Sequence, residues 1–254
     1  MKKVLVIAPF PMTDENRALR EGQLKSVEFG PDFRFEYRSV QAAPKNYVSA
    51  SDLALAEIGM LEAGLKAEAD GFDAVCIDTV SDSGVAALRS ELSIPVIGPG
   101  RTAILTAMML GNRFSILTMW DQWRHLYERT LGDLGLGHAC ASIRALGVTP
   151  DNRSLMAGKE DEIFPALLDL AERCVADDRA EVIILGSTTM HQAHSFLAER
   201  LPVPVINPGP LSYKLAEACL GLGLSHSRAA YPGPIAPRRE IIHAILEAVS
   251  EAHD

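Results

Sequence analysis

Several signatures of common protein classes are missing from this chain of 254 residues. It has neither a Walker-type phosphate loop nor a GxGxxG sequence, so nothing in it indicates a nucleotide site. Its four cysteines show no CxxC spacing, which would be typical of a zinc site or a redox pair. The net charge is -9, and no basic stripe is present to neutralise phosphates. We therefore expect no nucleic-acid partner.

Long apolar runs are also lacking, because no stretch reaches the roughly 18–20 residues that a membrane span needs. The N-terminal MKKVLVIAPF resembles a signal peptide, but Pro9 and Pro11 interrupt it and favour a first β-strand. Apolar residues make up 48% of the chain and charged residues 22%, which is ordinary globular composition. We expect a cytoplasmic protein with reduced cysteines that does not bind membranes. His191 and His194 have helical spacing but no evident third ligand, so no metal site is expected.

What the chain does contain is one α/β pattern that occurs twice. Residues 71–100 include FDAVCIDT, a helix-like run and SIPVIGPG, and residues 179–209 include AEVIILGS, a helix-like run and PVPVINPG. The strands that open the two copies, VLVIAPFP and FSILTMWD, also agree. Two such copies facing each other across a pseudo-twofold axis would place Thr79 and Ser187 on opposite walls of one cleft. That geometry suits an enzyme that works on both faces of a small molecule.

Strand-like runs alternate with helical periodicity along the whole chain. The runs predicted as strands are Val4–Pro9, Phe33–Val40, Ala74–Thr79, Pro95–Ile97, Phe114–Met119, His138–Leu146, Val182–Leu185 and Pro204–Ile206. The helical patterns include Leu53–Ala69, Ile163–Val175 and Ile241–Val249. This alternation predicts an α/β protein with parallel sheets built from βαβ units. We expect two lobes, residues 1–98 with 212–254 and residues 99–211.

The positions just after the strands are the candidate site, because ligands of parallel sheets bind beyond the carboxyl ends of the strands. Two hydroxyl-rich turns at equivalent places stand out, residues 79–84 and 186–191. Each leads into an expected helix, and a helix N-terminus with free backbone N–H groups favours an anion such as a carboxylate. The alternative is simple helix capping by Ser, Thr and Asp.

At these residues the chain resembles the aspartate/glutamate/hydantoin racemase superfamily, most closely its hydantoin and allantoin racemase branch. The segments that carry the resemblance are SDSGVAALR, IPVIGPG, LGNRFSILT, VIILGSTTM, LPVPVINP and LGLSHSRAAYP. The resemblance implies two Rossmann-like lobes, no cofactor, a small-molecule substrate and a homo-oligomer. It also implies a pair of cysteines that remove and deliver the proton on opposite faces of the substrate's α-carbon.

This chain departs from that pattern at both cysteine positions. Matching through SDSGV places Thr79 at the first position, and matching through ILGSTTM places Ser187 at the second. Cys76 lies three residues before Thr79, on the opposite face of an extended strand, and we interpret it as a core residue. Because aliphatic hydroxyls lose a proton less readily than thiols, such a pair starts about 5–8 kcal/mol worse as direct proton carriers.

These residues leave three functions open. The first is an isomerase that inverts an acidic C–H centre of a hydantoin-like ring or amino-acid derivative, with Thr79 and Ser187 as catalytic residues and Asp78, Asp82 or water assisting. The second is a hydrolase, desulfurase or lyase in which Ser187, with His191 as its base, or an activated water attacks the substrate. The third is a binding protein without catalysis. The residues predicted to contact the substrate are Pro9, Val80, Ser81, Thr118, Thr188, Thr189 and Tyr231.

Overall fold

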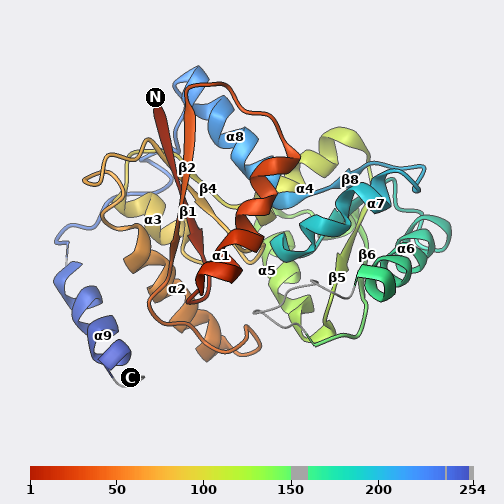
Figure 1. The fold of residues 1–254 in the computed structure, drawn as a ribbon, viewed down its shortest axis with the longest axis horizontal. Helices are drawn as coiled ribbons and strands as arrows, with labels where there is room; N and C mark the ends of the chain where they lie inside the picture. Colours follow the sequence, from red (N-terminus) through yellow and green to blue (C-terminus); the bar gives the residue numbers. More distant parts are fainter. Residues whose placement is uncertain (150–159, 238, 252–254) are drawn as a thin grey trace. The chain divides into compact units, whose positions relative to one another are not determined.

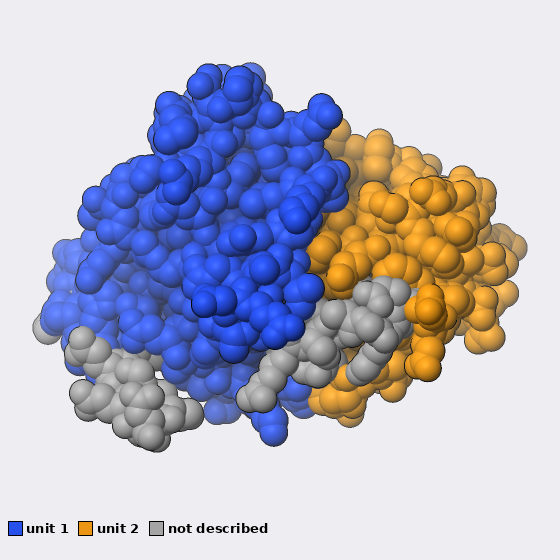
Figure 2. Space-filling model, viewed as in Figure 1, with its two compact units in different colours: residues 1–98, 212–254 blue, residues 99–211 orange. Residues whose placement is uncertain are grey.

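The computed structural model describes residues 1–149, 160–237 and 239–251, with side chains described over 1–149, 161–237, 239–245. Its contacts divide the chain into two compact units (Figure 2). Unit 1 comprises Met1–Gly98 and Ser212–Asp254, and unit 2 comprises Pro99–Leu211.

Unit 1 contains one sheet of four parallel strands in the order β2-β1-β3-β4 (Figure 1). Its strands are β1 (Lys2–Ala8), β2 (Phe33–Ser39), β3 (Ala74–Ile77) and β4 (Val96–Ile97). Its helices are α1 (Asp14–Glu21), the 3-10 helix η1 (Gly22–Ser26), α2 (Ala50–Gly64), α3 (Val85–Glu91), α9 (Arg239–Glu251) and most of α8 (Pro208–Leu222).

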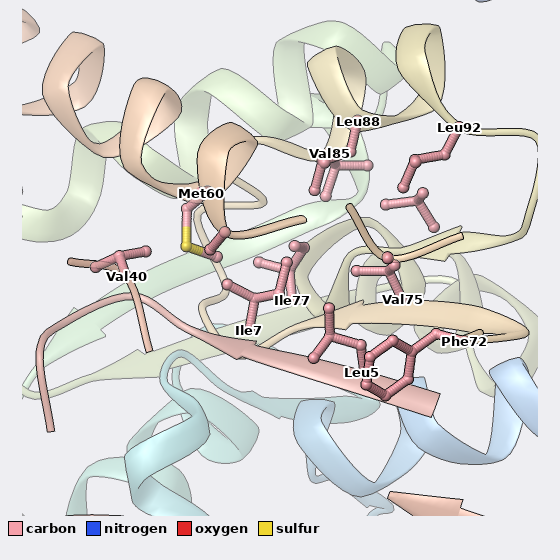
Figure 3. Close-up of a cluster of buried hydrophobic side chains, with 13 residues drawn as sticks. Leu5, Ile7, Val40, Met60, Phe72, Val75, Ile77, Val85, Leu88 and Leu92 are labelled. Atoms are coloured by element: carbon pink, nitrogen blue, oxygen red, sulfur yellow. The ribbon is translucent and has the colours of Figure 1, made fainter. Parts of the chain in front are cut away.

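The two faces of this sheet bury alternate residues of each strand, as the period of a β-strand requires. Leu5 and Ile7 of β1 belong to one apolar cluster, and Val4 and Val6 belong to another. Figure 3 shows the first cluster, in which Met60 of α2 and apolar side chains of α3 lie over β1 and β3. Tyr213 and Ala216 of α8 cover the other face, where Cys76 also lies. The interpretation of Cys76 as a core residue is confirmed, since its surface is 0% exposed.

Local sequence explains where α2 begins and how closely it packs. Ser49 and Asp52 form a capping box, in which each side chain accepts a hydrogen bond from the other residue's backbone N–H. At the other end of the helix, a Cβ atom at Gly64 would lie 2.5 Å from Cδ2 of Leu88 in α3. Glycine is therefore needed where α2 approaches α3.

Unit 2 contains a second sheet of four parallel strands in the corresponding order, β6-β5-β7-β8. Its strands are β5 (Phe114–Thr118), β6 (Cys140–Ala145), β7 (Val182–Leu185) and β8 (Val205–Ile206). Its helices are α4 (Pro99–Leu110), α5 (Arg124–Leu134), α6 (Glu160–Ala176) and α7 (His194–Ala198), with the 3-10 helices η2 (Asp121–Trp123), η3 (Gly137–Ala139) and η4 (Thr188–Ala193). Within this unit α4 packs on β7, and α6 packs on β5 and β6.

The predicted α/β class with parallel sheets is confirmed, and each predicted strand overlaps an observed one. Several boundaries differ by a few residues; β1, for example, begins at Lys2 and not at Val4. The first site strand ends at Ile77, so Thr79 lies in the turn after β3 and not in the strand. The helix predicted over Leu53–Ala69 spans Ala50–Gly64, because Ser49 caps its start and the chain turns after Gly64.

No helix in the described part of the chain is long and apolar enough to cross a membrane. Among the same residues, no group of three His, Cys, Asp or Glu side chains is placed to hold a metal ion.

Candidate functional site

In unit 1 the ends of β1 and β3 lie side by side at the carboxyl edge of the sheet. Ile7 pairs with Ile77 across the two strands, and the backbone N–H of Asp78 donates to the Ile7 carbonyl at 2.9 Å. Pro9 and Thr79 therefore share this edge. The buried Pro9 has its carbonyl oxygen held by the Tyr47 hydroxyl, which donates to it at 3.1 Å.

Unit 2 repeats this arrangement with β5 and β7. Leu117 pairs with Leu185, and the backbone N–H of Gly186 donates to the Leu117 carbonyl at 2.6 Å. Thr118 and Ser187 are thus the residues that share this edge. Each sheet brings together the side chains that the sequence predicted to lie after its two central strands.

A short row of hydroxyl groups follows each site strand. The Oγ1 atom of Thr79 lies 3.1 Å from Oγ of Ser81, and that atom lies 3.0 Å from Oγ of Ser83. In unit 2 the Oγ atom of Ser187 lies 2.8 Å from Oγ1 of Thr189. Both rows therefore begin with a hydroxyl pair two residues apart.

Thr79 and Ser187 also have the same degree of exposure. Both are half-buried, whereas Val80, Ser81 and Thr188 beside them are buried. A half-buried hydroxyl at a strand end can reach a small ligand. The buried neighbours can hold the turn in place.

Asp78, which the sequence offered as a base, is held in a buried ion pair. Its Oδ2 atom accepts from Nη1 of Arg20 at 2.6 Å, and its Oδ1 atom accepts from Nε2 of Gln23 at 3.0 Å. The side chains of Arg20 and Asp78 are 3% and 0% exposed. A carboxylate with both oxygens hydrogen-bonded in this way anchors α1 and η1 to the residue that follows β3. The role of Asp78 as a base stays a prediction.

Tyr127 of α5 supports the turn after β7 that carries Gly186 and Ser187. The sequence gave no signal that Tyr127 has this role. Its hydroxyl donates to the Gly186 carbonyl at 2.7 Å and lies 2.8 Å from Oγ1 of Thr118. Because the phenolic proton is used on the carbonyl, the Thr118 hydroxyl must donate to the Tyr127 oxygen. Burial raises the pKa of Tyr127, so the phenol remains a neutral donor at physiological pH.

The helix starts after these turns differ from the sequence expectation of anion-binding N-termini. After β3, the backbone N–H of Gly84 already donates to Oε2 of Glu57 at 2.6 Å, and α3 has only 7 residues. After β7 the chain forms the 3-10 helix η4, and the N-cap Ser187 accepts the Thr189 N–H through Oγ. Capping, the alternative reading of these hydroxyls, is thus what Ser187 does in this structure.

His191 was predicted as a base for Ser187, and it lies half-buried in η4. Among the described residues, Ser187 Oγ forms its hydrogen bonds with Thr189 and none with His191. The role of His191 as a base for Ser187 stays a prediction.

Tyr231, predicted to contact the substrate, packs against the later part of α3. Its hydroxyl accepts from Nη1 of Arg89 at 2.9 Å, the Arg89 guanidinium lies 5.1 Å from its ring centroid, and His226 makes an edge contact with the ring. These partners do not belong to the turn that carries Thr79. The contact of Tyr231 with a substrate stays a prediction.

None of the four cysteines is an activated thiol. Burial raises the pKa of Cys76, Cys174 and Cys219, and it raises the pKa of Cys140 to about 11. All four are unpaired, and Cys140 and Cys219 are only half-buried. The structure thus offers hydroxyls at the strand ends and no thiolate to replace them.

Two buried polar groups at the carboxyl edge of unit 2 were not singled out as site residues from the sequence. Asn207 follows β8 and is 7% exposed, and Trp123 ends η2 after β5 and is 9% exposed. The Oδ1 and Nδ2 atoms of Asn207 and Nε1 of Trp123 have no hydrogen-bond partner within the described residues. The sequence did carry a signal for Asn207. The repeated segments IGPG (residues 97–100) and INPG (residues 206–209) differ only there, where the second copy has asparagine in place of glycine.

Comparison with known proteins gives a family match over most of the chain. The model described as Asp/Glu/Hydantoin racemase matches residues 21–216, a range that includes both hydroxyl turns. The hydantoin racemase of Rhizobium meliloti is 32% identical over 194 residues, which are 74% of this chain and 78% of that protein. The hydantoin racemase of Pseudomonas sp. (strain NS671) is 31% identical over 192 residues, 75% of each chain.

Solved structures show the same fold. An allantoin racemase from Klebsiella pneumoniae superposes with a TM-score of 0.84 at 24% identity, covering 93% of this chain and 95% of that one. An allantoin racemase from Pseudomonas fluorescens gives a TM-score of 0.81 at 27% identity, covering 93% of this chain and 98% of that one. The similarity therefore extends over nearly the whole length of the compared proteins.

Proposed function

This chain belongs to the Asp/Glu/hydantoin racemase family, and on that basis we propose that it is a cofactor-independent isomerase of the racemase or epimerase type. The proposed substrate is a small hydantoin-like ring or amino-acid derivative with an acidic C–H centre. Thr79 and Ser187 are the proposed substrate-contacting hydroxyls, in place of the thiols of related racemases. The observation that carries the proposal is their equivalence: each is a half-buried hydroxyl after a central strand, paired with a second hydroxyl two residues later.

A hydroxyl acts here mainly as a hydrogen-bond donor. Its proton is so weakly acidic that the group does not ionise to an alkoxide base at neutral pH. When a C–H bond beside a carbonyl loses its proton, negative charge develops on the carbonyl oxygen. Donors held in place near that oxygen stabilise the charge without reorganising. The rows that begin at Thr79 and Ser187 supply such donors, and each hydroxyl can pass a proton on, since it both donates and accepts.

Because hydroxyl donors alone do not remove the proton, the substrate's C–H bond must itself be acidic. A C–H bond beside a ring carbonyl is more acidic than that of a free amino acid, so it tolerates a weaker base. The proposed proton acceptor is the carboxylate of Asp78 or Asp82, acting directly or through a water molecule. We therefore propose that ring-type substrates are turned over faster than open-chain amino acids. Proline and valine side chains at the unit 1 edge, Pro9 and Val80, limit the water around that centre.

One experiment separates the isomerase from the two other functions. Hydantoins, thiohydantoins, allantoin and amino acids are incubated with the protein in deuterated water and followed by NMR. The isomerase exchanges the substrate's α-proton for deuterium without making new fragments. A hydrolase, desulfurase or lyase releases a fragment, and a binding protein raises the unfolding temperature with ligand but shows neither change.

We also propose that the protein works as a homo-oligomer, on the strength of the family resemblance. Light scattering coupled to size-exclusion chromatography measures the subunit number directly.

A further inference from the structure

Asn207 carries a carboxamide that the protein itself does not use. The residue is 93% buried, since 7% of its surface is exposed, yet neither Oδ1 nor Nδ2 meets a partner in the part of the chain that is described. Buried polar groups in folded proteins are nearly always hydrogen-bonded, because leaving them unpaired costs stability. Because ligands of parallel sheets bind at the carboxyl edge, an unpartnered group there is a candidate for binding a ligand.

Helix capping does not account for this side chain. Asn207 directly precedes α8, where an asparagine ordinarily accepts from the N–H of the second or third helical residue. The third residue is Pro210, which has no N–H, and Oδ1 of Asn207 accepts no hydrogen bond from the second, Gly209. The group of Asn207 that serves the helix is its backbone carbonyl, which accepts the Leu211 N–H at 3.2 Å.

The corresponding position in unit 1 is Gly98, directly after β4. A Cβ atom at Gly98 would lie 2.6 Å from Cγ of Asp82, so the carboxylate of Asp82 fills the place that a side chain would take there. In unit 2 the polar group at this place comes from the strand end itself. The asymmetry gives unit 2 a neutral group with both a donor and an acceptor.

Asn207 also has a suitable neighbourhood. β8 pairs with β7 so that Ile206 lies opposite Ile184, which puts Asn207 one strand away from the turn that carries Ser187. β5 flanks β7 on the other side, and the unpartnered indole N–H of Trp123 follows that strand. Unpartnered polar groups thus follow both strands that flank β7, Asn207 directly after β8 and Trp123 at the end of η2.

We infer that Asn207 is a specificity-determining residue that binds a cis-amide group of the substrate, with Trp123 as a second donor to a substrate carbonyl. A carboxamide presents an N–H and a C=O side by side, and its complement is an N–H beside a C=O, as in a ring amide, imide or ureide. The inference deepens the proposed function and rests on it for the identity of the site. It favours ring compounds, in which an amide N–H and C=O lie side by side on one edge, over open-chain amino acids, which have no such amide edge.

The test uses 5,5-dimethylhydantoin, which has the ring amides but no C–H bond at the reacting carbon. Its binding, measured by calorimetry on the full chain, is therefore independent of whether the protein isomerises anything. The comparison ligand is the same ring methylated on both nitrogens, which has no N–H donor. The variants are Asn207→Leu, Asn207→Asp and, as a matched control, Asn112→Leu at an exposed asparagine of the same unit.

We expect 5,5-dimethylhydantoin to bind the natural protein and the control, and the N-methylated ring to bind at least about tenfold more weakly. Asn207→Leu and Asn207→Asp should each lose about tenfold or more in affinity, because leucine offers no hydrogen bond and aspartate offers no donor. Without ligand, Asn207→Leu should unfold at a temperature no lower than the natural protein, because it removes polar atoms that have no partner.

Equal binding of the two rings, or unchanged affinity in Asn207→Leu, overturns the inference. So does a failure of 5,5-dimethylhydantoin to bind the natural protein. A clear loss of stability or failure to fold in Asn207→Leu would mean that the carboxamide has a structural partner, and this also contradicts the inference. Binding of 5,5-dimethylhydantoin without any isomerisation of other rings keeps the inference and rejects the proposed function.

Discussion

The Oγ atom of Ser187 lies 2.8 Å from Oγ1 of Thr189 and accepts a hydrogen bond from the Thr189 backbone N–H at 3.3 Å. Because that N–H uses one of the lone pairs of Ser187, its hydroxyl proton can point to Thr189 or to a ligand. A serine held in this way can donate its hydroxyl proton to a ligand. The account of the site as a set of hydroxyl donors follows from this pairing.

Thiol modification provides a first prediction. At about pH 7.5 the thiols are protonated, because burial raises the pKa of every one of them, that of Cys140 to about 11. We expect iodoacetamide to react slowly and to leave isomerase activity unchanged, with the extent of labelling measured by mass spectrometry. A loss of activity in step with the labelling of one cysteine would contradict a mechanism based on hydroxyls.

Installing thiols is the reciprocal prediction. Replacing both Thr79 and Ser187 by cysteine should make the racemisation of ordinary hydantoins appear or improve, because a thiol ionises several pKa units below a hydroxyl. Polarimetry or chiral chromatography measures the rate. The same variant should become sensitive to iodoacetamide, which makes it the positive control for the preceding prediction.

The buried ion pair predicts a stability effect and separates an anchoring role of Asp78 from a catalytic one. Replacing Arg20 by Met removes the charged partner of the buried Asp78 carboxylate and keeps its hydrogen bond with the Gln23 amide. The substitution should lower the free energy of unfolding by about 3–5 kcal/mol, as measured by urea denaturation. The control is Lys2→Met, whose exposed pair with Asp73 should contribute less than about 1 kcal/mol. Equal effects of the two substitutions would show that the buried pair does not anchor the fold.

Gly186 is required by the close approach of β5 and α5. A Cβ atom there would lie 2.6 Å from the Leu117 carbonyl oxygen and 2.8 Å from the Tyr127 hydroxyl. Gly186→Ala should therefore destabilise unit 2 by about 1–3 kcal/mol in thermal or urea unfolding. The matched control is Gly132→Ala in α5, where a Cβ atom meets nothing within 4 Å and should stabilise the helix by up to about 1 kcal/mol.

The fold was largely predictable from the sequence because its signal is local and repeated. Continuously apolar runs such as Val182–Leu185, separated by helical periodicity, define the strands of a parallel sheet. The duplicated Pro-Gly pairs also marked equivalent positions, although Pro99 and Pro208 begin helices α4 and α8 and do not form turns. The side chains after neighbouring strands could be assigned to one sheet edge. These inferences need only the period of the pattern and the direction of the strands.

The rest depended on partners that are distant in the sequence. Arg20 meets Asp78 across 58 positions, and no pattern around either residue predicts that the carboxylate is paired. Tyr127 reaches Gly186 across 59 positions from a helix whose periodicity only indicates burial. The unpartnered carboxamide of Asn207 is visible only when every potential partner has been located. The contact between Tyr231 and Arg89 joins residues 142 positions apart, so the sequence gave no sign of it either.

The central claim, that alcohols at Thr79 and Ser187 support proton exchange at carbon, is tested most directly by deuterium incorporation into a chiral hydantoin, followed by proton NMR. The natural protein and a Ser90→Ala control should exchange the α-proton, since the Ser90 hydroxyl donates to the Ala87 carbonyl of its own helix. Thr79→Val and Ser187→Ala should each slow the exchange about tenfold or more, with the folded state verified by circular dichroism. Exchange that is as fast in both variants as in the natural protein would contradict the claim.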